Sequence, residues 1–182
     1  MSAVTQTVTT AHPGVVLRPA VRADVALILA LIRELAEYER EPDAVLATEA
    51  LLEAQLFGAQ PAAEVMIAEA DGQPAGFALF FHNFSTWQGR RGLYLEDLFV
   101  RPQFRGRGVG HALIAYLARL AVQRDCARFE WSVLDWNAPA IGFYRRIGAV
   151  GMDGWTVQRI DGEALRRLAA SSADAADRPE SD

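Results

Sequence analysis

The chain has 182 residues, of which 51% are hydrophobic and 23% are charged, and its formal net charge is −5. This size and composition are typical of one globular domain with its own core. The negative charge argues against a nucleic-acid partner, which usually requires a basic face. No apolar run is long enough to span a membrane, and the first residues lack the features of a signal peptide. We therefore expect a cytoplasmic protein without a membrane segment.

Three segments are expected from the distribution of polar and apolar residues. Residues 1–13 are small and polar and are expected to be disordered. Residues 14–170 are expected to form one domain, because no linker or internal repeat divides them. Residues 171–182 carry four acids and one arginine and are expected to form a disordered acidic tail.

Hydrophobic periodicity predicts a mixture of strands and helices within the domain. Short connections between the middle strands are typical of hairpins, so the sheet cannot be wholly parallel and the fold class is α/β. In chain order, we expect a strand at 15–17, helices at 25–36 and 47–57, strands at 64–70 and 75–81, a loop at 83–92, a strand at 93–100, a helix at 109–120, a strand at 129–134, a helix at 137–146, a strand at 156–160 and a helix at 163–170.

Side chains that bind metals or form disulfides are scarce. Cys126 is the single cysteine, which excludes an internal disulfide, and the three histidines are His12, His82 and His111. No two of these side chains have the spacing of a metal-ligand pair. We therefore expect no metal site.

A glycine-rich loop, Arg105-Gly106-Arg107-Gly108-Val109-Gly110, lies between a predicted strand and a predicted helix. Glycine at every second position lets the backbone expose N–H groups on one side, and the following helix adds more. Such a loop can bind phosphate or pyrophosphate. A tight turn with solvated arginines is an equally good interpretation. The loop lacks the Gly-Lys-Ser/Thr ending of a P-loop and the spacing of a dinucleotide-binding motif.

The predicted strand LYLEDLFV, residues 93–100, carries two adjacent acids, Glu96 and Asp97, inside an apolar run. Successive strand residues point to opposite faces, so the two carboxylates can act together only if a β-bulge turns one of them. From the residues alone, ion pairs with arginines are the favoured interpretation.

Several segments together resemble a known family. VRPQFRGRGVG is similar to the acetyl-CoA loop of the GNAT superfamily of N-acetyltransferases. The resemblance covers roughly residues 15–170 and implies the GNAT fold, a mixed and mostly antiparallel sheet flanked by helices. The segments that resemble the spermidine/spermine (diamine) acetyltransferases, in matching order, are RPAVRADVALILALIRELAEYE, LYLEDLFV, LDWNAPAIGFYRRIGA and GWTVQRIDGEAL.

The resemblance implies a base and an acid. An alkylammonium ion with a pKa of about 10.4 must lose a proton before it can attack a thioester. The family's base is the glutamate of YLED, here Glu96, which we expect to be half-buried. The family's acid is the tyrosine of the FY pair, here Tyr144, which would protonate the departing CoA thiolate; a core tyrosine is the alternative interpretation. The resemblance also implies that the backbone is splayed at this strand, so that the carbonyl group of the thioester can meet a backbone N–H.

The resemblance also implies binding residues. The amine would be bound by Trp87, Asp97, Asp153 and Trp155, where aromatic faces and negative charge suit a cation. Plain packing also fits the tryptophans, and a helix N-cap also fits Asn137. The co-substrate acetyl-CoA would be bound by Leu98, Phe99, Val100, Arg105, Gly106, Arg107, Gly108, Val109, Gly110, Asn137 and Arg146.

The expected substrate is a small primary amine: a diamine, a polyamine, or a thialysine- or lysine-like compound. Ser85-Thr86-Trp87 has a serine where the polyamine enzymes tend to have an acid, so the chain looks closer to the thialysine-type branch. Two other functions remain open, a protein lysine or N-terminal acetyltransferase and a non-catalytic acyl-CoA sensor. Because the family commonly forms symmetric dimers, a homodimer is expected.

Overall fold

The protein is described from a computed structural model, and the structure describes residues 6–173. The chain divides into two compact units, one ending at Ser132 and the other beginning at Val133. The first contains β1 (Val8–Thr9), β2 (Val15–Pro19), α1 (Val25–Glu39), α2 (Glu49–Phe57), β3 (Glu64–Ala70), β4 (Gln73–Ser85), β5 (Arg90–Val100), α3 (Val109–Gln123) and β6 (Phe129–Trp131), with short 3-10 turns η1 (Arg22–Asp24), η2 (Pro42–Ala44) and η3 (Pro102–Phe104). The second contains α4 (Ala138–Arg146) and α5 (Gly162–Ala173).

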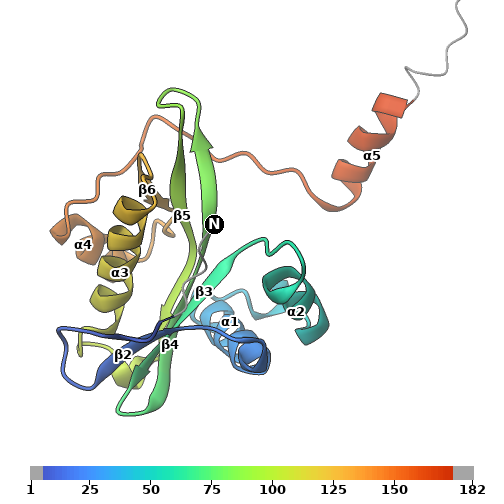
Figure 1. Cartoon of the computed structure of the whole chain (residues 1–182). Coiled ribbons are helices and arrows are strands. Elements are labelled where there is room, and N and C mark those ends of the chain that lie inside the picture. The colour runs from blue at the N-terminus through green and yellow to red at the C-terminus, as the bar shows by residue number, and fades with distance from the viewer. Residues whose placement is uncertain (1–5, 174–182) are drawn as a thin grey trace, which may run out of the picture. The chain divides into compact units, whose positions relative to one another are not determined.

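The strands form one six-stranded sheet in the order β1-β2-β3-β4-β5-β6. All neighbouring strands are antiparallel except β5 and β6, which are parallel. Within this unit α1 and α2 lie on one face of the sheet and α3 lies on the other (Figure 1). The expected α/β fold with a mixed, mostly antiparallel sheet is confirmed.

Alternate residues of the strands are buried on the two faces of the sheet. Ile67 and Phe77 belong to the cluster that packs with Ile28 and Leu31 of α1. Met66, adjacent to Ile67 on β3, is also buried, and its side chain points to the α3 face because strand side chains alternate. Apolar burial of this extent provides the main stabilisation of the unit.

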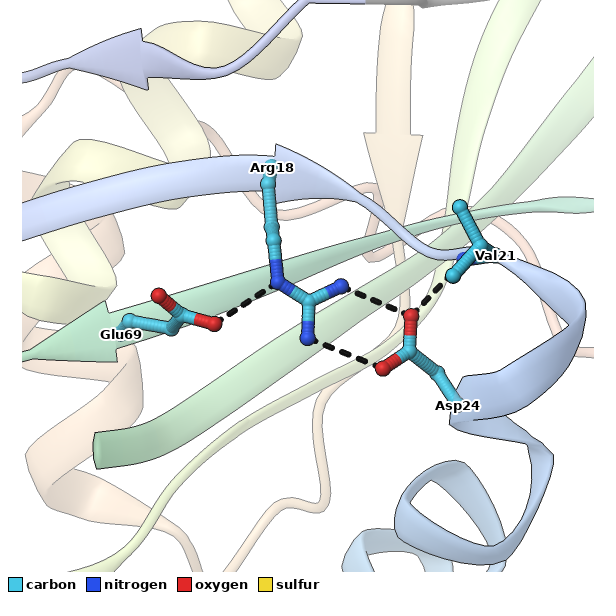
Figure 2. A network of polar contacts seen from close by, with 4 residues as sticks. All are labelled: Arg18, Val21, Asp24 and Glu69. Atoms are coloured by element: carbon cyan, nitrogen blue, oxygen red, sulfur yellow. Dashed lines mark hydrogen bonds and ion pairs between the residues drawn. The ribbon is translucent and has the colours of Figure 1, made fainter. Parts of the chain in front are cut away.

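A polar network fixes the start of α1 to the sheet (Figure 2). Arg18 on β2 donates two hydrogen bonds to the carboxylate of Asp24, at 2.7 and 2.9 Å, and a third to Glu69 at 2.7 Å. The backbone N–H of Val21 donates to Asp24 at 2.8 Å. Arg18 holds the pKa of the Asp24 carboxyl below its usual 3.8. The network therefore stabilises the turn that connects the first long strand to the first helix.

The prediction of a loop over residues 83–92 is wrong, because strands β4 and β5 extend through most of these residues. Asn83 pairs with Gly92 and Ser85 pairs with Arg90, which leaves a turn of four residues. Gly92 is instead a strand residue, and its missing side chain makes room for Asn83 and Arg128.

The strand expected at 156–160 is also absent, although the residue types favour one. Within the described residues of the second unit there is no strand with which these residues pair, and isolated strands are not stable. The strand expected at 129–134 ends at Trp131. Among residues 6–173, no helix combines the length and apolar character that a membrane crossing needs.

The expected chain ends differ from the structure where they are described. Val8 and Thr9, within the segment 1–13 that was expected to be disordered, pair with Leu17 and Val16 of β2. Helix α5 continues to Ala173, three residues into the expected tail. Residues 1–5 and 174–182 lie outside the described residues.

Candidate active site

Strand β5 contains a β-bulge at Glu96. Asp97 lies opposite Leu79 of β4 and Leu95 lies opposite Phe80, so Glu96 has no partner in the register. One extra residue reverses which side chains face each side of the sheet. As a result, Asp97 turns toward the α1 face, whereas Leu95 points to the α3 face. The structure therefore contains the β-bulge that is needed to turn one of the two acids.

The two adjacent acids of β5 differ in exposure. Glu96 is exposed, so the expectation of a half-buried Glu96 is wrong, because the bulged residue stands outside the regular pleat. Asp97 is partly buried, and burial raises its pKa from 3.8 to about 6. The negative charges of Glu96 and of Glu39, at the end of α1, add to the increase. Sequence reasoning misses Glu39, because only the fold brings the end of α1 near this strand.

We predict that Asp97→Asn stabilises the fold at neutral pH. In the unfolded chain Asp97 ionises near its usual pKa of 3.8, whereas the folded protein retains the proton up to a pH of about 6. The raised pKa therefore makes stability fall as the pH rises through this interval. The expected gain for the variant at pH 7.5 is about 1–3 kcal/mol, measured by urea unfolding. At a pH of about 3.5 the gain should disappear, and an equal gain at both pH values would contradict a buried charge.

The edge of β5 beyond the bulge is uncovered by other strands. Strand β6 pairs with β5 only at Leu93, Tyr94 and Leu95. In the part of the chain that the structure describes, no strand follows along the same edge from Glu96 to Val100. An extended ligand can pair with backbone groups at such an edge as an added strand.

The glycine loop leads from this strand into α3. Gly106 and Gly108 have φ values of +75° and +83°, in the left-handed region that favours glycine. Gly108 is the N-cap of α3, a helix of 15 residues whose first N–H groups have no partner within the helix. A Cβ at Gly106 would meet nothing within 4 Å, so the backbone is open there. The loop therefore fits a phosphate group held by backbone N–H donors.

The arginines of the loop have protein partners. Arg105 donates from Nε to the carbonyl oxygen of Val100 at 2.9 Å, and its guanidinium carbon lies 4.6 Å from the ring centre of Tyr38. Arg107 forms an ion pair with Asp71 at 2.6 Å. These contacts shape the loop, and binding of cofactor phosphate by the same arginines stays a prediction.

Other predicted binding residues of the first unit are fixed in the core. Phe99 and Val109 are buried, so only their main-chain groups can contact a ligand. The side chains of Leu98 and Val100 are half-buried on the face of α3, where they approach Gly110. The structure thus brings the strand, the bulge and the glycine loop together within one unit.

The predicted aromatic side chains of the amine site are exposed. Trp87 is in the turn between β4 and β5 and is 88% exposed. In the second unit, Trp155 is 71% exposed, and its backbone N–H donates to the carbonyl oxygen of Met152 at 3.0 Å. Asp153 lies in the same turn and is also exposed. The roles of these three residues stay predictions.

The remaining predicted site residues lie on or next to α4. Asn137 is the N-cap of this helix and accepts a hydrogen bond from the N–H of Ala140 at 3.3 Å, which confirms the capping interpretation. Tyr144 is half-buried, with its ring centre 5.4 Å from that of Phe143. Arg146 is exposed at the end of the helix. No cluster of three or more potential metal ligands occurs among the described residues.

Comparison with known proteins relates the whole arrangement to one family. Residues 28–149 match the model of the acetyltransferase (GNAT) family. A thialysine N-epsilon-acetyltransferase from Sus scrofa is 40% identical over 86% of this chain and 98% of its own. An L-ornithine N5-acetyltransferase from Arabidopsis thaliana is 30% identical over 84% of this chain and 86% of its own.

Solved structures agree with the fold. An integron cassette protein from V. cholerae superposes with a TM-score of 0.73 at 28% identity, covering 86% of this chain and 98% of the other. A ribosomal-protein-alanine N-acetyltransferase from Brucella melitensis has a TM-score of 0.65 at 24% identity, covering 81% and 99% of the two chains. At that identity the second match supports the fold alone.

Proposed function

The chain belongs to the GNAT acetyltransferase family, and we propose that it transfers the acetyl group of acetyl-CoA to a small primary amine. Acetyl transfer to amines is the activity of the similar proteins; the donor, the amine and the residue roles are the proposal. The observation that carries it is the bulged strand β5, which bears two acids and ends at the glycine loop.

The proposed donor fits two features of the first unit. The glycine loop at Gly106–Gly110, which is open at Gly106, suits the pyrophosphate, and the uncovered edge of β5 from Leu98 to Val100 suits the extended pantetheine arm. Asn137 and Arg146 of the second unit are proposed as further contacts. When bound, acetyl-CoA supplies the acetyl group as a thioester.

In the proposed mechanism, Glu96 removes the proton from the substrate ammonium group. A neutral amine is the nucleophile, and only about one alkylamine molecule in a few thousand is neutral at pH 7. The exposed position of Glu96 at the bulge allows a substrate to reach it, directly or through one water molecule. Attack forms the C–N bond as the thioester C–S bond breaks, and the thiolate that leaves takes its proton from Tyr144. The second proton that the amine nitrogen loses restores the Tyr144 phenol, directly or through water.

We predict that Tyr144→Phe lowers kcat by about a hundredfold while leaving the affinity for acetyl-CoA within about twofold of wild type. The variant lacks the phenol proton but keeps the ring that lies next to Phe143. Turnover is followed by CoA release and affinity by calorimetry. Phe143→Leu, which changes the neighbouring ring but no acid, is the control. Unchanged kcat would remove Tyr144 from the mechanism.

The amine is proposed to be amino-acid-like. Two similar enzymes are named for thialysine and for ornithine, and these names support a lysine-like substrate for this chain. Asp97 is proposed to bind a second positive group, because a desolvated carboxylate gains most from a cationic partner. Trp87, Trp155 and Asp153 are proposed to border the same amine.

An amine panel tests the proposal. CoA release from acetyl-CoA is measured with thialysine, lysine, ornithine, putrescine, spermidine and a lysine peptide. Turnover on the small amino-acid-like amines is the expected result. Turnover only on the peptide would favour a protein acetyltransferase. Binding of acetyl-CoA without turnover on any amine would favour a non-catalytic sensor.

We further propose a homodimer in the cytoplasm. The second unit exposes Val150, Val157, Leu165 and Leu168, with 49% or more of each side chain accessible. Exposed apolar side chains of this kind are suited to a protein interface. Sedimentation equilibrium tests the dimer, and a mass near 20 kDa, that of the single chain, would contradict it.

A further inference from the structure

The segment between β1 and β2 supports the glycine loop at two points, directly at the first and through Asp71 at the second. At the first, His12 lies over Gly108, so closely that a methyl group on Gly108 would overlap the imidazole ring. At the second, the carbonyl oxygen of Gly14 accepts from the N–H of Asp71 at 2.9 Å, and Asp71 forms the 2.6 Å ion pair with Arg107. The glycine loop is thus supported from outside by residues distant in sequence.

The first contact includes a hydrogen bond between two histidines. Nε2 of His12 lies 3.2 Å from Nδ1 of His111, and the two rings meet edge to face with their centres 5.3 Å apart. His111 is the third residue of α3, directly after the loop. His12 therefore connects the N-cap glycine of the helix with its first turn.

Below the histidine pair, β1 does not pack tightly against α3. A pocket of about 190 Å³ lies between them, lined by side chains that include Ala112, Ala115 and Tyr116 of the helix. His12, which contacts both Gly108 and His111, connects the segment to the start of the helix beside this pocket.

We infer that His12 is a positioning residue for the co-substrate, acting through the conformation of the Gly106–Gly110 loop. This rests on the proposed function, in which that loop binds the pyrophosphate of acetyl-CoA. The ring of His12 covers one side of Gly108 and its hydrogen bond holds His111, so the N–H groups of the loop keep the spacing that an anion requires. His12 contacts neither the acetyl group nor the amine in this scheme.

The test compares two acetyl donors. Acetyl-CoA carries the pyrophosphate, and S-acetyl-pantetheine lacks every phosphate. His12→Ala is expected to raise KM for acetyl-CoA about three- to tenfold with kcat nearly unchanged, the scale of one lost hydrogen bond. The kcat/KM for S-acetyl-pantetheine should stay within about twofold of wild type. A variant that merely unfolds would lose activity with both donors.

Two further variants separate positioning from bulk packing. His12→Gln should recover most of the acetyl-CoA affinity, because its amide can donate or accept and therefore suits either tautomer of His111. His12→Leu fills similar space without a hydrogen bond and should not recover it. His111→Ala should resemble His12→Ala, and the double variant should be no worse than either alone. Val122→Ala, on an 80% exposed residue of α3, is the control.

The outcomes also separate this inference from the proposed function. The same comparison is made by calorimetry with CoA and pantetheine, which needs no amine substrate. If wild type binds CoA no more tightly than pantetheine, both the phosphate-binding loop and the role of His12 are overturned. If wild type prefers CoA and His12→Ala keeps that preference in full, only the role of His12 is overturned.

Discussion

Glu96→Gln is expected to lower kcat for amine acetylation by about a thousandfold near pH 7, within the range that general bases contribute. Glutamine keeps the size of the side chain and cannot take a proton from the substrate ammonium group. Affinity for acetyl-CoA should be unchanged, because the proposed donor contacts are backbone groups of β5 and of the glycine loop. CoA release under saturating acetyl-CoA, with calorimetry of acetyl-CoA binding, measures both quantities.

The same experiment decides between the two acids of the bulge. As the amine becomes neutral at higher pH, the need for a base falls, so the Glu96→Gln variant should recover part of its rate toward a pH of about 10. Asp97→Asn should instead raise KM for the amine more than it lowers kcat. If Asp97→Asn abolishes kcat and Glu96→Gln retains more than a third of the rate, the roles are reversed. Glu53→Gln, an exposed acid on α2, is the control.

The contrast between these acids follows from the bulge. In an unbulged strand Asp97 would share a face with Leu95, against the buried side chains beneath α3. The extra residue places Asp97 toward α1, near the charge of Glu39, and leaves Glu96 exposed at the kink. A single irregularity of one strand therefore produces an accessible acid and a desolvated acid side by side, and it does so next to the uncovered edge of β5.

Features carried by local patterns were predictable from the sequence. The strand at Glu64–Ala70 has the predicted limits, and α1 and α3 cover the predicted helical stretches, because apolar spacing and turn residues determine them locally. The glycine loop and the adjacent acids were also visible as motifs. Each of these motifs is a short continuous stretch, so its residue types alone indicate anion binding or acid–base chemistry.

Features that depend on distant contacts were not predictable. The exposure of Glu96 depends on register against β4, and the relevance of Glu39 depends on where α1 ends. His12 gave no signal, because its partner His111 is 99 residues away. The strand expected at 156–160 failed for a related reason, since β propensity is expressed only where a neighbouring strand accepts the hydrogen bonds.

The second large expected effect concerns stability and follows from the hydrogen bonds between Arg18 and Asp24. Asp24→Asn is expected to lower the free energy of unfolding by about 2–4 kcal/mol at pH 7, because it leaves a guanidinium group with only Glu69 to balance it (Figure 2). Asp24 is 9% exposed and the side chain of Arg18 is 25% exposed, so water replaces little of the lost interaction. Urea unfolding followed by circular dichroism measures the change.

The effect of Asp24→Asn on stability is expected to depend on pH. Because Arg18 lowers the pKa of Asp24 below 3.8, the pair stabilises the fold above that pH and loses its contribution as the pH falls through the folded pKa. The difference between wild type and Asp24→Asn should therefore shrink on acidification below a pH of about 4. Glu53→Gln breaks the ion pair with Arg22, in which the Glu53 side chain is 48% exposed and the Arg22 side chain is 59% exposed. This variant should lower the free energy of unfolding by less than about 1 kcal/mol. Equal losses in the two variants would mean that burial gives the Arg18 network no advantage over a surface ion pair.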